Sequence, residues 1–136
     1  MRYIYLYLHT AIGVFLLSLF SSCSSRSNEK MFVDEAEEQN RLCPVMIDNY
    51  TRIDSIHYTA TDNAFHYYYT LTGDGDNSLI ANQMRERLQE QISVEVKESV
   101  GLSIHRKSRV TMEYIYFSEK NNDELFRVVV TPDMYR

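Results

Sequence analysis

The stretch "TRIDSIHYTATDNAFHYYYTL", residues 51–71, decides the fold, because it predicts two strands joined by a tight turn. Both flanks are rich in β-branched and aromatic residues, which favour strands. Between them, "TDNA" contains Asp62 and Asn63, a pair that tolerates positive φ and suits a hairpin. The sequence therefore predicts a first β-hairpin.

The predicted hairpin has one apolar and one polar face. We expect Tyr58 opposite Tyr67 and Ile56 opposite Tyr69, since alternate side chains of a strand point to opposite faces. The apolar face then carries Ile56, Tyr58, Ala60, Phe65, Tyr67, Tyr69 and Leu71. The other face carries Ser55, His57, Thr59, His66, Tyr68 and Thr70. The first face is expected to be core and the second to face water.

A helix and a second hairpin follow. Residues 78–99 carry an apolar side chain at every fourth position, which predicts a long helix ending before Gly101. Residues 110–117 and 125–131 are predicted to form two further strands. The order of elements predicts an α+β domain, a four-stranded antiparallel sheet with one long helix (ββαββ).

The register of the second hairpin follows from the same alternation. We expect Ile115 and Phe117 to share the core face with the apolar side chains of the last strand, Phe126, Val128 and Val130. Tyr114 and Tyr116 are then predicted to face outward.

The first residues of the chain suggest export. Arg2 precedes an apolar run that is strongest over residues 11–20, which fits the core of a secretory signal. A membrane-spanning helix needs about 20 apolar residues, more than this run provides. The small residues before Cys23 resemble a bacterial lipobox. This resemblance implies a lipoprotein signal peptide over residues 1–22 and lipidation of Cys23. An ordinary cleaved signal and an uncleaved anchor remain open alternatives.

The predicted domain boundaries follow from composition. Residues 24–40 are mostly polar and acidic, so we interpret residues 23–40 as a lipidated N-terminus and a flexible tether. Residues 41–136 suffice for a single α+β domain. Ser24 after the cysteine favours the outer over the inner membrane by one bacterial sorting convention. The expected location is the cell envelope, lipid-anchored, with the domain outside the cytoplasm.

Charge and cysteine content narrow the possible partners. The net charge is −5, so nucleic acid is not an expected partner, because binding it requires positive charge against the phosphates. Of the two cysteines, lipidation of Cys23 would leave Cys43 alone, without a disulfide framework. We expect no cofactor.

Three motifs resemble a known group of proteins. "CPVMIDNYTRIDS" at residues 43–55, "HYYYTL" at 66–71 and "VTMEYIYFSEKNNDELFRVVVTPD" at 110–133 are similar to a group of small uncharacterised bacterial proteins. Those proteins share a PxxxD…TRxDS…YxYTL pattern and often carry export signals. The match covers about residues 42–133. The group has no established activity, so the resemblance implies domain boundaries and export but no mechanism.

Candidate sites are few. No catalytic motif occurs, and His57 and His66 lack a third ligand nearby, so we expect neither a catalytic nor a metal site. A cluster at the start of the first strand, Asp48, Thr51, Arg52 and Asp54, is expected to include an Arg52–Asp54 ion pair. Tyrosine favours interfaces because it combines contact area with a polar tip. The candidate binding face therefore comprises His57, His66, Tyr68, Tyr114 and Tyr116.

The hypothesis that these observations favour is a lipid-anchored cell-envelope protein with a small, non-enzymatic interaction domain. It is expected to bind the membrane through its lipid and an envelope protein through its sheet, in an oligomeric state that the sequence does not indicate. A first alternative is an immunity or inhibitor lipoprotein that blocks a toxin or a lytic enzyme. A second alternative is a metal-dependent or hydrolytic envelope enzyme.

Overall fold

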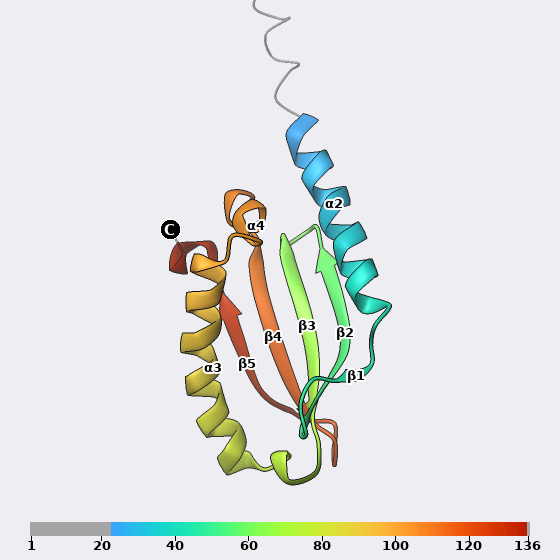
Figure 1. The fold of residues 1–136 in the computed structure, drawn as a ribbon, viewed down its shortest axis with the longest axis vertical. Coiled ribbons are helices and arrows are strands. Elements are labelled where there is room, and N and C mark those ends of the chain that lie inside the picture. The colour runs from blue at the N-terminus through green and yellow to red at the C-terminus, as the bar shows by residue number, and fades with distance from the viewer. Residues whose placement is uncertain (1–22, 136) are drawn as a thin grey trace, which may run out of the picture. The chain divides into compact units, whose positions relative to one another are not determined.

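The computed structural model describes residues 23–135 and the side chains of residues 28–135. The chain divides after Met31, and the sheet lies in the second unit, Phe32–Arg136. The helices and strands, labelled in Figure 1, are α2 (Cys23–Asn40), β1 (Val45–Met46), β2 (Thr51–Thr59), β3 (Ala64–Leu71), η2 (Gly73–Gly75), α3 (Ser78–Glu98), α4 (Ser103–Lys107), β4 (Thr111–Ser118), β5 (Glu124–Val130) and η3 (Pro132–Met134).

The sheet has five strands in the order β1-β2-β3-β4-β5, and its β3–β4 pair is parallel while its other pairs are antiparallel. The prediction of a four-stranded antiparallel sheet with one long helix is therefore wrong. The reason is the length of α3, whose 21 residues span about 31 Å at 1.5 Å per residue. That distance returns the chain along the whole of β3, so β4 starts beside the start of β3 and runs parallel to it (Figure 1).

The first hairpin keeps its predicted faces in a shifted register. Ile56 pairs with Tyr67 instead of Tyr69, and the loop holds Asn63 at a φ of 52°. A shift of two residues leaves every side chain on its face, because the side-chain period of a strand is two. The predicted polar face of this hairpin is the face of the sheet that α3 does not cover.

The second hairpin differs by one residue from the prediction, which reverses the faces of β4. Tyr114 pairs with Val128 and Tyr116 with Phe126, so both tyrosines lie on the helix-covered face. They stack there on the neighbouring strand, Tyr114 on Tyr67 and Tyr116 on Tyr69, with ring centroids 4.8 and 4.7 Å apart. These ring stacks between β3 and β4 favour the observed face.

The core lies between the sheet and α3, which packs on β5. It comprises Leu71, Ala81, Ile92, Val96, Met112, Tyr116, Phe126, Val128, Val130 and Tyr135. At the start of α3, the Asn77 side chain caps the helix by accepting a hydrogen bond from the Leu79 N–H at 2.9 Å.

Residues 32–40, expected in the flexible tether, form the second half of α2 and pack on the domain. Phe32 and Ala36 are only 1% and 3% exposed, because they lie four residues apart on one side of the helix. At the end of α2, the Asn40 side chain accepts a hydrogen bond from the Ile56 N–H at 2.8 Å. The folded domain therefore starts before residue 41.

The predicted signal peptide, residues 1–22, lies outside the described residues, and Cys23 is the first residue of α2. Within residues 23–135, no helix combines the length and apolar character needed to cross a bilayer.

Candidate functional site

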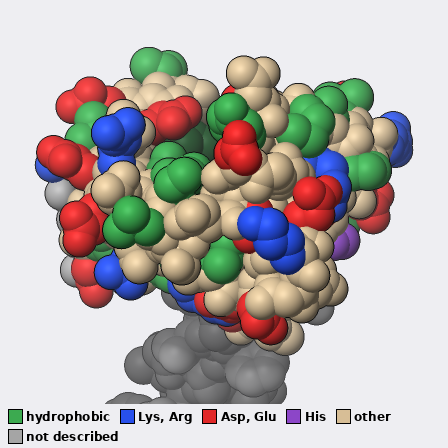
Figure 2. All heavy atoms as spheres, turned by 90° about the horizontal axis from the view of Figure 1, so that it is seen from below, with side chains coloured by type: hydrophobic (Ala, Val, Ile, Leu, Met, Phe, Trp, Pro, Cys, Tyr) green, Lys and Arg blue, Asp and Glu red, His purple; other side chains and the backbone are tan. Residues whose placement is uncertain are grey.

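Exposed apolar side chains gather at the end of the sheet where β2 begins and β3 ends. They are between 38% and 67% exposed and comprise Val45, Met46, Ile47, Tyr50, Leu79 and Ile80. Figure 2 views the molecule from this end and shows hydrophobic side chains among acidic and basic ones around a hollow. Apolar groups clustered at a surface mark interaction sites more often than single ones do.

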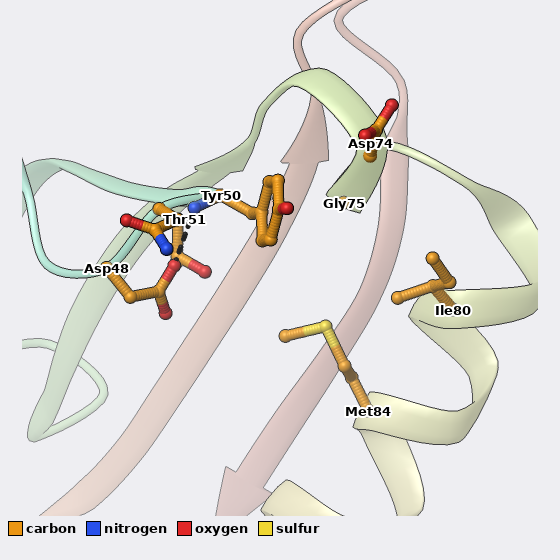
Figure 3. A pocket seen from close by; sticks show the side chains of 8 residues that line it. Asp48, Tyr50, Thr51, Asp74, Gly75, Ile80 and Met84 are labelled. Carbon is orange, nitrogen blue, oxygen red and sulfur yellow. Dashed lines mark hydrogen bonds between the residues drawn. The ribbon is translucent and has the colours of Figure 1, made fainter.

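The hollow is a pocket of about 460 Å³, which we call the end pocket. This volume lies within the range of ligand-binding sites in proteins. Its lining comprises Asp48, Asn49, Tyr50, Thr51, Asp74, Gly75, Ile80 and Met84. Three segments contribute: the turn before β2, the short helix η2 and the first turns of α3 (Figure 3). Ile80 and Met84 lie four residues apart, so both face the pocket from one side of α3.

The backbone of Tyr50 is fixed from both sides. Its N–H donates a hydrogen bond to Asp48 Oδ1 at 2.8 Å, and its carbonyl accepts one from the Thr72 N–H at 2.8 Å. A Cβ atom on Gly75 would lie 2.6 Å from the Cβ of Tyr50, so this close approach requires glycine. The side chain of Tyr50 is still 48% exposed. The pocket therefore presents an aromatic ring on a held backbone.

Asp76 directly follows the pocket residue Gly75, and its side chain is buried. Its Oδ2 accepts hydrogen bonds from Ser118 Oγ at 2.9 Å and from the Lys120 N–H at 3.0 Å. Lys120 Nζ also donates to the Asp76 carbonyl at 2.6 Å. These bonds tie the segment after η2 to the end of β4, which preorganises the pocket for binding.

The predicted cluster at the start of β2 divides between two places. Asp48 and Thr51 line the end pocket. Arg52 and Asp54 form an ion pair on the other face of the sheet, where Asp54 also accepts a hydrogen bond from Thr70 Oγ1.

Three of the five predicted binding-face residues lie together. His57 pairs directly with His66 across β2 and β3, and Tyr68 lies beside both, with ring centroids 5.9 Å from His57 and 6.5 Å from His66. Tyr114 and Tyr116 are not on this face, so their assignment to it is wrong.

The described residues contain no group of three or more His, Cys, Asp or Glu side chains that could hold a metal ion. His66 instead lies 3.4 Å from the carboxylates of Asp62 and Glu113.

The sequence analysis does not include four lining residues of the end pocket among its candidate site residues: Tyr50, Gly75, Ile80 and Met84. A sign was available for Tyr50 alone, because the motif "CPVMIDNY" places it close to Val45, Met46 and Ile47 in a segment without strand alternation.

The fold is shared with three solved structures. A protein from Pseudomonas aeruginosa, described as secreted, has a TM-score of 0.67 and 14% identity, covering 85% of this chain and all of its own. The pilotin EpsS of the Vibrio vulnificus type 2 secretion system has a TM-score of 0.59 and 9% identity. The match covers 82% of this chain and 94% of EpsS. The pilotin AspS of the Vibrio cholerae type II secretion system has a TM-score of 0.57 and 12% identity. The match covers 81% of this chain and 94% of AspS.

The chain belongs to a family described as a domain of unknown function (DUF8479), which matches residues 27–126. The match begins inside α2 and includes residues 32–40, of which Phe32 and Ala36 are buried. No curated protein matches this chain.

Proposed function

We propose that this protein is a lipid-anchored, non-enzymatic binding protein of the bacterial cell envelope, whose end pocket holds an apolar segment of a partner protein. The observation that carries the proposal is the set of exposed apolar side chains around a preorganised pocket. Leaving such groups in water is unfavourable, at about 25 cal/mol per Å² of apolar surface, and a bound partner removes that cost.

The lining of the end pocket supports binding to an apolar group. Tyr50, Ile80 and Met84 supply apolar contact, and Asp48 and Asp74 supply negative charge near it. The described lining residues include the two carboxylates but no His, Cys or Lys.

The position of the pocket in the folded unit supports a partner other than the anchoring membrane. The chain enters this unit at Phe32, which packs against Tyr58 and Phe65 where β2 ends and β3 begins. The end pocket lies at the opposite end of these two strands. The chain therefore enters this unit at the end of the two strands that is remote from the pocket.

The structural comparisons support the envelope as the place of action. Two of the solved structures with this fold are pilotins of type II secretion systems, and the third is described as secreted. The proposed lipid on Cys23 would hold the present chain in the same compartment.

Site-specific photo-crosslinking in cells tests the proposal. A photoreactive amino acid replaces Ile47, which is 56% exposed beside the end pocket, or Val94, which is 49% exposed on α3 and serves as the matched control. We expect a discrete crosslinked partner from position 47 that is absent at position 94 and is lost with Ile80→Ser. Equal crosslinking from both positions, or none from position 47, would refute the proposal.

The identity of the crosslinked product separates the proposed function from the inhibitor alternative. A component of an envelope assembly supports the proposal. A lytic enzyme or a toxin as the sole product supports an inhibitor.

A further inference from the structure

A second hollow lies on the helix-covered face of the sheet, between α2 and α3. It measures about 560 Å³, and four tyrosines of β3 and β4 form its floor: Tyr67, Tyr69, Tyr114 and Tyr116. Glu35 of α2 and Glu95 of α3 stand on its two sides. We call it the tyrosine groove. It is separate from the end pocket, which meets the first turns of α3, whereas the groove meets the last ones.

The floor of the groove presents hydroxyl groups. Tyr67 and Tyr114 stack within 7° of parallel, and Tyr69 and Tyr116 within 11°. Since side chains stand roughly perpendicular to a sheet, the hydroxyl ends of these rings are directed away from it, into the groove. Burial raises the pKa of Tyr69 to about 12, so its hydroxyl keeps its proton at neutral pH.

Tyr116 contributes an accessible hydroxyl to the groove. Its side chain lines the groove and is only 4% exposed, yet among the described residues its hydroxyl is not one of the fully buried polar atoms that lack a partner, which are the two ring nitrogens of His105. A bound group with hydrogen-bonding atoms could therefore reach this hydroxyl.

The charge of the groove is negative and uncompensated. Glu95 forms no ion pair with a described residue, and its charge contributes to the raised pKa of Tyr69. Glu35 lies 3.1 Å from His105 Nε2, a buried histidine whose pKa burial lowers, so this neighbour does not neutralise Glu35 at neutral pH. No Lys or Arg is among the described lining residues. Arg106, near the groove, donates to the carbonyls of Val96 and Ser99.

We propose that the tyrosine groove binds a Lys or Arg side chain on a linear segment of a partner protein. The cationic head would donate hydrogen bonds to Glu95 and to the tyrosine oxygens, and its aliphatic stem would pack along the ring edges and Ile92. A peptide fits better than a free amine, because the volume of the groove exceeds that of one ammonium group. Gln39 and Ser99 in the lining can also form hydrogen bonds with a peptide backbone. The inference does not depend on the end pocket.

Peptide binding to the full-length protein in detergent tests this inference. The probe is a fluorescent 12-residue Leu/Arg peptide, compared by anisotropy with the same peptide carrying Gln for every Arg. We expect the Arg peptide to bind at least about tenfold tighter, and more weakly as salt increases. Glu95→Gln should weaken Arg-peptide binding about tenfold. Glu90→Gln, an exposed position of α3 outside the groove, should leave it unchanged.

Two further variants keep the result interpretable. Tyr116→Phe keeps the ring stack and removes only the hydroxyl, so it should weaken Arg-peptide binding about threefold without changing the fold. Ile80→Ser alters the end pocket and should leave peptide binding intact. Equal binding of the Gln peptide, or no effect of Glu95→Gln, would overturn the inference. Competition by spermidine at the same concentration as the peptide would overturn the assignment to a peptide.

Discussion

Replacing Phe32 by alanine should remove the main contact of α2 with the domain. The ring is 1% exposed and lies 4.9 to 5.8 Å, between centroids, from the rings of His105, Tyr58 and Phe65. Truncating a buried Phe to Ala costs about 3–5 kcal/mol, from lost burial and the cavity left behind. A domain of this size is stable by about 5–15 kcal/mol in total, so the loss is a large share of it.

Urea unfolding measures this loss. The chain has no tryptophan and 11 tyrosines, so near-ultraviolet circular dichroism of tyrosine reports the folded state. With a urea slope of about 1–3 kcal/mol per M, the midpoint should fall by about 2 M. Hydrogen exchange should show amides 33–40 opening before those of the sheet. Glu37→Ala, exposed on the same helix, should change stability by less than about 0.5 kcal/mol.

A loss below about 1 kcal/mol would refute the reasoning, provided that amides 33–40 also exchange rapidly in the wild-type protein. Residues 32–40 would then be the tether that their polar composition suggests.

Three further predictions concern anchoring, the end pocket and pH. Cys23→Ala should leave uncleaved precursor or a soluble product, and unchanged mass and detergent partitioning would contradict lipidation. Gly75→Ala should cost about 1–3 kcal/mol in urea, because the new Cβ meets Tyr50 at 2.6 Å, and crosslinking at the end pocket should fall with it. Burial lowers the pKa of His105 and outweighs the opposing effect of Glu35, so below its usual pKa of about 6.5 the unfolded chain binds a proton that the folded protein does not. Stability should thus be full above about pH 6.5 and decline below it. His105→Phe should flatten this decline in urea midpoints measured from pH 5 to 7.5.

Local sequence patterns predicted the first hairpin, the long helix and the core face of β5. Local patterns could not predict the parallel pairing of β3 and β4. The direction of β4 relative to β3 depends on the path of the helix that connects the two strands. The faces of β4 were also misassigned, since "MEYIYF" alternates apolar and aromatic residues on both sides. Its orientation depends on stacking against Tyr67 and Tyr69, which no local pattern contains.

The candidate sites were predicted only in part. Tyr114 and Tyr116 were selected for their chemistry but assigned to the opposite face, and they lie in the floor of the tyrosine groove. The end pocket was missed because its lining joins the turn before β2 to the segment that runs from η2 into α3, and the β2–β3 hairpin separates these two stretches in the sequence. The packing of α2 was hidden by its composition, because the short apolar run at residues 31–33 and the single Ala36 stand in a polar and acidic stretch.

The parallel β3–β4 pair also dictates the order in which the domain can assemble. β3 pairs with β4 along its whole length, from Ala64 with Thr111 to Leu71 with Ser118. As the chain emerges N-terminus first, the β2–β3 hairpin is complete while the partner of β3 has yet to appear. Until residue 118 has emerged, the edge of β3 that will pair with β4 is exposed and can pair with strands of other chains. A chaperone that shields this edge during biogenesis would therefore act in the interval before β4 emerges.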